Sequence, residues 1–159
     1  MNSLSLLLLG MLFCMSAVFP SPLRADNIAP DDRTALQGLK EARVIFDVRL
    51  AELDKLLFNL GLVKETWEGM NSQGVKPTMI VTLRGPAVRL FIREQATREL
   101  LDLLADMKKK GVRIEICSVA TRVFKVDNRQ LVPEVVLVGN VLTSQIAMQN
   151  KGYALITLN

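Results

Sequence analysis

The sequence predicts an α/β fold with a mainly parallel sheet of five strands and helices on both of its faces. Short runs rich in Val, Ile and Leu are typical of strands buried on both faces of a sheet. Between these runs, apolar residues recur at the spacing of a helix. The two patterns alternate from Ala42 onward, and such alternation requires crossover connections between parallel strands. The length of 159 residues suits one domain.

The first half of the domain is expected to contain two strands and two long helices. Residues 42–48 are apolar and β-branched, which predicts a buried strand. Leucines at helical spacing then predict a helix over residues 50–72. A second strand is expected at residues 78–83, followed by a turn at Arg84-Gly85-Pro86. The clearest helical pattern covers residues 94–110.

The second half repeats the alternation with shorter elements. A third strand is expected at residues 112–116, and a short helix or turn at 118–125. A fourth strand is expected at residues 134–138, after a proline, and a helix at 142–149. The final strand is expected at residues 153–158. We find no internal repeat and no second domain in the sequence.

An apolar leader precedes the predicted domain. Residues 4–18 are almost wholly apolar, with the length of a signal-peptide core, and are short for a membrane span of roughly 20 residues. We therefore expect a signal peptide at residues 1–25, an N-terminal arm at 26–41 and the α/β domain at 42–159. The expected location is the periplasm, without stable membrane insertion after cleavage; an uncleaved membrane anchor is the alternative.

The composition excludes several function classes. The chain has no histidine, and loss of the leader would remove Cys14 and leave Cys117 as the only cysteine. This rules out Cys–His and Ser–His–Asp catalytic groups, histidine-ligated metals and Cys-x-x-Cys redox centres. We expect no cofactor and no metal. The formal net charge of +4 is mild and the basic residues are scattered, so we expect no nucleic-acid partner.

Ligands of open parallel sheets bind beyond the carboxyl ends of the strands, which gives a short list of candidate site residues. The predicted strand ends are followed by polar or reactive residues or by glycine: Asp47, Arg49, Arg84, Gly85, Cys117, Gly139 and Asn140. Asp47 is equally well interpreted as a cap for the following helix. Arg84 is a candidate for contact with an anion.

Cys117 is the strongest candidate on this list. A thiol between a strand and a helix start is close to the positive end of the helix, which favours the thiolate nucleophile. Arg122, about one turn further on, would add positive charge. The alternative is that Cys117 is a buried packing residue, because free cysteines are among the most buried residues in proteins. Without an imidazole base, the chemistry that suits a lone thiol is sulfur transfer through a persulfide.

Residues 42–158 resemble the DsrE/DsrF-like (DsrEFH) sulfur-relay family, in its small, exported, single-domain branch. The resemblance lies in five stretches: Arg84-Gly85-Pro86-Ala87, residues 111–121 around Cys117, Leu131-Val132-Pro133-Glu134-Val135, Val138-Gly139-Asn140, and Gln149 followed by Gly152-Tyr153-Ala154. The resemblance implies a flavodoxin-like three-layer α/β/α fold and a tendency to form oligomers. It also implies a sulfane-sulfur carrier cysteine, at the position of Cys117. Many relatives have histidine where this chain has Arg84, so a role for that histidine does not carry over.

The leading hypothesis is a periplasmic sulfur carrier, or sulfurtransferase-like protein, with a persulfide on Cys117. Arg84, Gly85, Arg122 and Asn140 are the candidate ligand-binding residues. The expected partners are further copies of the chain and a sulfur donor or acceptor, either a protein or a small sulfane-sulfur compound. Two alternatives stay open: a non-catalytic oligomeric binding or assembly module, and a thiol redox sensor.

Overall fold

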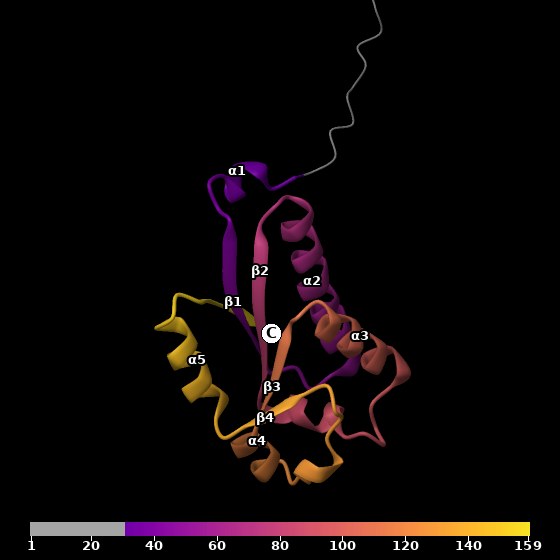
Figure 1. Cartoon of the computed structure of the whole chain (residues 1–159). Coiled ribbons are helices and arrows are strands. Elements are labelled where there is room, and N and C mark those ends of the chain that lie inside the picture. The colour runs from indigo at the N-terminus through magenta and orange to yellow at the C-terminus, as the bar shows by residue number, and fades with distance from the viewer. Residues whose placement is uncertain (1–30) are drawn as a thin grey trace, which may run out of the picture. The chain divides into compact units, whose positions relative to one another are not determined.

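Five parallel strands form a single sheet in the order β4-β3-β2-β1-β5 (Figure 1). The computed structural model describes residues 31–159, and the predicted signal peptide lies outside them. The strands are β1 (Glu41–Val48), β2 (Lys76–Leu83), β3 (Arg113–Cys117), β4 (Val136–Val138) and β5 (Ala154–Leu158). The predicted parallel sheet of five strands is therefore confirmed.

Helices cover the two faces of the sheet unequally. The helical elements are α1 (Arg33–Leu36), α2 (Leu53–Ser72), the 3₁₀ helix η1 (Gly85–Phe91), α3 (Arg98–Lys109), α4 (Ser118–Val123), the 3₁₀ helix η2 (Asn128–Gln130) and α5 (Val141–Gln149). Long helices α2 and α3 lie together on one side, whereas α5 lies on the other (Figure 1). The result is the expected three-layer α/β/α arrangement. None of the described helices is both long and apolar enough to cross a membrane.

The strand order explains why α5 has a face to itself. The chain lays down β1 to β4 in sequence, then returns to the free side of β1 with β5. Crossovers between parallel strands are right-handed. When the chain reverses the direction in which it adds strands across the sheet, the connecting helix therefore lies on the opposite face. The layers match those of flavodoxin, although the strand order of flavodoxin itself is 2-1-3-4-5. Helix α5 consequently packs over the carboxyl half of the sheet from its own side.

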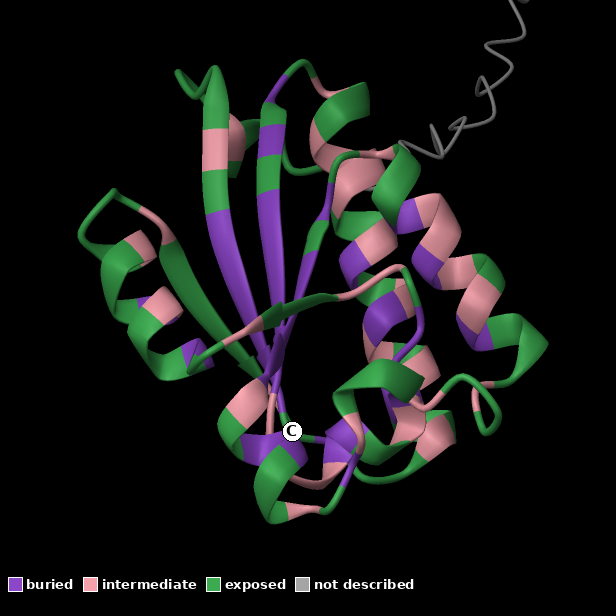
Figure 2. Ribbon diagram, turned by 60° about the horizontal axis from the view of Figure 1, so that its bottom comes forward, coloured by how far each residue is buried: buried purple, intermediate pink, exposed green. Residues whose placement is uncertain are grey.

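The main apolar core lies between the sheet and helices α2 and α3. On β1, the side chains of Val44, Phe46 and Val48 enter this core, where they meet Leu56 of α2 and Leu104 of α3. Each such side chain contributes about 1.5–3 kcal/mol when fully buried. Strands β1 and β2 are buried mainly over their carboxyl halves, as the purple segments in Figure 2 show. The sheet edge that carries the candidate residues is thus rigidly held.

Helix α3 and the segment before it differ from the sequence-based expectation. The helix was expected to begin at residue 94 but begins at Arg98, because the hydroxyl of Thr97 caps it by accepting the Leu100 N–H at 3.3 Å. Only a turn was expected after β2, whereas residues 85–91 form a 3₁₀ helix. Gly85 has a φ of 63°, a conformation that favours glycine, and the following Pro86 suits a helix start.

Other element boundaries also shift. Strand β4 covers only three of the five expected residues, and it lies at a sheet edge after Pro133. Strand β3 extends one residue further than expected, to include Cys117. The described part of the predicted N-terminal arm contains the one-turn helix α1, and Glu41 already belongs to β1.

Candidate functional site

A pocket of about 220 Å³ lies at the carboxyl ends of the central strands and of β4. Four of the five predicted site residues line it: Arg84, Gly85, Cys117 and Asn140. The other lining residues are mostly apolar: Val119, Ala120, Val123, Phe124, Val141 and Leu142. Arg84 and Cys117 are 33 positions apart, and Asn140 is a further 23 positions along the chain. They come together here because parallel strands end at the same edge.

Cys117 is the last residue of β3 and the N-cap of helix α4. Its thiol is free, and the residue is only 4% exposed. The side chain is part of the apolar core cluster and also forms part of the pocket wall. Helix α4 has six residues, so few peptide dipoles add up at its start. A reagent would therefore have to approach the sulfur through the pocket.

Among the described residues, Arg84 is the one cationic side chain in the lining of this pocket. Its Nε donates to Asp47 Oδ1 at 2.9 Å, and its Nη2 donates to Asp47 Oδ2 at 2.8 Å. Such a two-point guanidinium–carboxylate pair is strong and directional. The hydrogen bond with Asp47 is the main cause that raises the pKa of Arg84, and its coulombic interaction with Cys117 acts in the same direction. Arg84 therefore stays charged beside the sulfur.

Asp47 is an ionised carboxylate in a buried position, only 3% exposed. Burial alone would raise its pKa, but hydrogen bonds from Arg84 and Gln145, together with the charges of Arg84 and Arg49, outweigh burial and lower the pKa below 3.8. The Nε of Arg49 is 3.8 Å from Asp47 Oδ2. The alternative role as a helix cap is wrong, because α2 begins after Glu52.

Gln145 of α5 completes a hydrogen-bond network that the sequence analysis did not find. Its Nε2 donates to Asp47 Oδ1 at 3.0 Å and to Thr82 Oγ1 at 2.7 Å, and Thr82 Oγ1 donates to the Phe46 carbonyl at 3.3 Å. The signal was present: Gln145 lies four residues after Val141, hence on the same helix face. A polar residue on the inward face of a short helix points to a buried partner.

The two remaining predicted residues have different surroundings. Arg122 is exposed on α4 and does not line the pocket. Asn140 lines the pocket and caps α5, because its Oδ1 accepts the Leu142 N–H at 3.0 Å. The structure thus brings together Cys117, Arg84, Gly85 and Asn140, and leaves Arg122 outside.

Comparison with known proteins identifies the family. The model of the DsrE/DsrF-like family matches residues 49–158, which contain the pocket and all of its lining residues. The chain belongs to the DsrE/DsrF-like family. The resemblance seen in the sequence is therefore confirmed. No curated protein matches the chain.

Solved structures share the fold of this DsrE/DsrF-like chain. A protein of unknown function from Methanobacterium thermoautotrophicum, MTH1491, is 19% identical, with a TM-score of 0.63. The ychN protein from E. coli is 17% identical, with a TM-score of 0.57. Each alignment covers 73% of this chain and 98% of the other. At these identities the comparisons establish the α/β fold.

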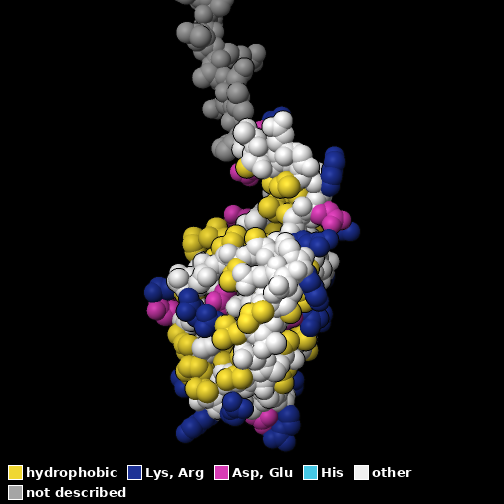
Figure 3. Space-filling model, turned by 90° about the vertical axis from the view of Figure 1, so that its left-hand side faces the viewer, with side chains coloured by type: hydrophobic (Ala, Val, Ile, Leu, Met, Phe, Trp, Pro, Cys, Tyr) yellow, Lys and Arg dark blue, Asp and Glu magenta, His cyan; other side chains and the backbone are white. Residues whose placement is uncertain are grey.

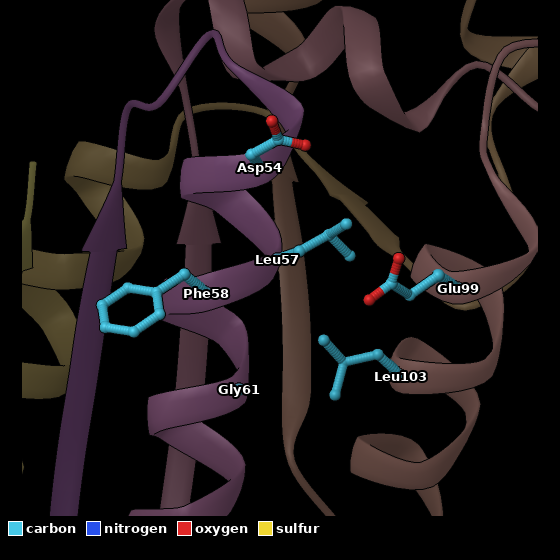
Figure 4. A pocket seen from close by; sticks show the side chains of 6 residues that line it. All are labelled: Asp54, Leu57, Phe58, Gly61, Glu99 and Leu103. Atoms are coloured by element: carbon cyan, nitrogen blue, oxygen red, sulfur yellow. The ribbon is translucent and has the colours of Figure 1, made fainter.

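A second depression of this DsrE/DsrF-like domain lies between α2 and α3, with a volume of about 480 Å³. Leu57, Glu99 and Leu103 point toward one another across it, whereas Phe58 points away (Figure 4). The described residues that line it include the carboxylates of Asp54 and Glu99, but no thiol, no hydroxyl and no cation. Within residues 31–159 no group of three or more His, Cys, Asp or Glu side chains is placed to hold a metal ion. Of these two sites, the Cys117 pocket is the one that combines a thiol with a cation.

Proposed function

We propose that this DsrE/DsrF-like protein carries sulfane sulfur as a persulfide on Cys117. The observation that supports the proposal is the meeting of a free thiol and a charged guanidinium, from Cys117 and Arg84, in one small pocket. Membership of the DsrE/DsrF-like family supports the same chemistry, because the resemblance to that family implies a sulfur-carrier cysteine at the position of Cys117. The protein would act as a sulfur carrier or a sulfurtransferase-like enzyme.

The reaction needs no imidazole base. The Cys117 thiolate attacks a donor's sulfane sulfur, a new S–S bond forms, and the donor's own bond to that sulfur breaks with the electron pair going to the leaving group. In the second step an acceptor thiolate attacks the outer sulfur of the persulfide. The S–S bond breaks, and the electron pair returns to Cys117. Arg84 stabilises the anionic forms of the sulfur through its fixed positive charge.

Persulfide formation can be measured directly. The full chain is incubated with inorganic polysulfide, digested, and the Cys117 peptide is examined by mass spectrometry for one added sulfur atom. The added sulfur should disappear after incubation with a small thiol acceptor, and the Cys117→Ser chain should show none at this position. Absence of added sulfur on Cys117 with polysulfide and with other sulfane-sulfur donors would refute the proposal.

Burial of Cys117 favours a second candidate, a non-catalytic binding or assembly module. In that case the thiol serves packing, as its membership of the core cluster allows. Alkylation with iodoacetamide separates the two functions. A carrier thiol reacts in the folded protein, whereas a packing thiol reacts only after denaturation.

Further copies of the chain are the partners that we propose for the exposed apolar surface. Leu142 and Ile146 of α5 and Leu155 of β5 are exposed. In Figure 3 hydrophobic side chains gather over the side of the domain on which α5 lies. Isolated domains rarely expose many large apolar side chains on one side. We propose that this α5–β5 surface joins copies in a homo-oligomer.

Export to the periplasm is proposed on the apolar leader alone. Cleavage after Ala25 would leave Asp26 as the first residue. N-terminal sequencing of the protein purified from its native host, after separation of periplasm, cytoplasm and membranes, measures both the location and the cleavage. A full-length protein in the membrane fraction would instead indicate an uncleaved anchor.

A further inference from the structure

Arg84 uses only one edge of its guanidinium to bind Asp47. The bonds to the carboxylate come from Nε and Nη2, and Nη1 has no hydrogen-bond partner among residues 31–159. A guanidinium offers five N–H donors in a rigid, planar fork. With one edge occupied, the other edge is fixed in direction and remains available to a group in the pocket that Arg84 lines.

The charges around this free edge favour an anion. Asp47 is approached by the guanidinium groups of Arg84 and Arg49, so the three side chains together carry one net positive charge. The pocket lining contains no acidic side chain. The buried carboxylate on β3, Glu115, is bound by Arg113 at 2.7 Å and by Ser144 at 2.5 Å. Arg84 is therefore a cation in the pocket lining that has no competing carboxylate beside it there.

The size of the pocket restricts the ligand. Its volume of about 220 Å³ is below the range of about 300–1,000 Å³ that is usual for drug-sized ligands. Apolar side chains, among them Val119, Val123 and Leu142, form the rest of the wall. A ligand of a few heavy atoms with one anionic end suits this combination.

We propose that the pocket takes a small sulfur oxoanion of the thiosulfate class as the sulfur donor, with its oxygens on the free edge of Arg84, and that Asp47 and Gln145 position that edge. This inference rests on the proposed function of Cys117. The Cys117 thiolate attacks the outer, sulfane sulfur of thiosulfate and forms a persulfide. The S–S bond of thiosulfate breaks, and sulfite leaves with the electron pair. The reaction balances without an oxidant or a reductant.

Asp47 and Gln145 act through Arg84 and do not line the pocket. The Gln145 amide donates one hydrogen to Asp47 and the other to Thr82. Gln145 on α5 thus fixes the Asp47 carboxylate, which in turn binds Arg84. Small errors in the position of a binding group cost large factors in rate. Loss of either residue should thus slow persulfide formation from thiosulfate, even though Arg84 itself remains.

The experiment compares two reagents on the same thiol. In the full chain with Cys14→Ser, the rate of persulfide formation on Cys117 is measured with thiosulfate, and the rate of alkylation is measured with neutral iodoacetamide. Arg84→Gln, Asp47→Asn and Gln145→Leu are tested, with Arg122→Gln as a control that removes a cation outside the pocket. Circular dichroism checks that each variant is folded.

We expect Arg84→Gln, Asp47→Asn and Gln145→Leu to slow thiosulfate loading by about tenfold or more. The iodoacetamide rate should stay within about twofold for Asp47→Asn and Gln145→Leu, which keep Arg84. For Arg84→Gln it should fall, but by less than the rate of thiosulfate loading. For Asp47→Asn the direction of the change in thiosulfate-loading rate is decisive, because the substitution makes the site more positive. Simple charge attraction then predicts faster loading, whereas positioning predicts slower loading. If Asp47→Asn does not fold, Gln145→Leu still tests positioning. It changes no charge, so simple charge attraction predicts an unchanged loading rate, whereas positioning predicts slower loading.

Three outcomes overturn the inference while leaving persulfide carriage intact. Polysulfide loads Cys117 but thiosulfate does not; or the Arg84 variant loads from thiosulfate as fast as the parent chain; or the Asp47 and Gln145 variants both load at the parental rate. Failure of polysulfide as well as thiosulfate to load Cys117 contradicts the proposed function itself.

Discussion

On β1, neighbouring residues of one strand face two different environments. Val44, Phe46 and Val48 enter the apolar core beneath α2 and α3. Asp47, which alternates with them, faces α5 and binds Arg84 and Gln145. Successive side chains of a strand point to opposite faces, so one short segment supplies both environments. The face under α2 and α3 thus contributes mainly stability, whereas the face under α5 holds the charged and polar groups of the candidate site.

The two faces also differ in energy. Burial of apolar side chains is favourable by itself. Burial of a carboxylate costs several kcal/mol and is recovered only through good partners, so buried ion pairs are weak contributors to net stability. The Asp47 network therefore has no evident advantage as a stabilising device over an apolar replacement. A role in fixing Arg84 beside Cys117 explains its presence better.

The variant Leu104→Ala on α3 should show most clearly that the two faces of the sheet have different roles. Leu104 is 0% exposed in the core. The substitution should lower the free energy of unfolding by about 2–5 kcal/mol, because it removes apolar contacts and leaves a cavity. Urea unfolding measures this loss. The rate of Cys117 alkylation in the still-folded variant should stay near that of the parent, and a large change would show that the two faces are not independent.

On the other face, Asp47→Asn should lower the free energy of unfolding by about 1–3 kcal/mol at neutral pH, since a charged hydrogen-bonding partner is lost. Because the pKa of Asp47 is lowered by folding, its contribution is fully present above the unfolded value of about 3.9 and is lost as the pH falls through the folded value. The stability difference between parent and variant should therefore narrow below about pH 4. A difference that stays constant down to pH 2 would contradict the assigned charge state.

Substitution of Ile146, which is 62% exposed on α5, should act on assembly rather than on folding. Ile146→Lys should shift the molecular mass measured by light scattering towards that of the monomer, while the free energy of unfolding of the separated chains changes by no more than about 0.5 kcal/mol. Gln149→Lys, also exposed on α5, is the matched control. A parent chain that is already monomeric would show that the exposed surface has another purpose.

The smallest effect is expected for Arg122. Its side chain is exposed and outside the pocket, so Arg122→Ala should change the iodoacetamide rate of Cys117 by less than about twofold. The measurement decides between Arg84 and Arg122 as the cation that acts on the sulfur. A fall comparable to that of Arg84→Gln would restore the role that the sequence suggested for Arg122.

Much of the fold could be predicted because its signals are local. The apolar run of β1 and the leucine spacing of α2 identify those elements without any tertiary information. The start of α3 was missed by four residues because Thr97 competes with an otherwise helical pattern through its capping hydroxyl. The rule for parallel strand ends placed Arg84, Cys117 and Asn140 at one edge, and the pocket contains all three.

The partners within the site could not be predicted in the same way. Asp47 and Gln145 are 98 positions apart, and nothing in either local pattern specifies that they meet. Their contact depends on the return of the chain to the free side of β1, which places α5 over the carboxylate. Arg122 shows the converse: it is close to Cys117 in sequence, yet the turn of α4 directs it to solvent.

By itself, the sequence determined the alternation of strands and helices, the absence of histidine chemistry and the position of Cys117 at a strand end, because each depends on composition or on short-range periodicity. The tertiary structure decided which charged groups stand beside the sulfur. In the folded chain Arg84 binds Asp47, Asp47 is also bound by Gln145 of α5, and Arg84 lines the same small pocket as Cys117. Those contacts depend on the order of the strands and on the face that each connection takes, which only the folded chain specifies.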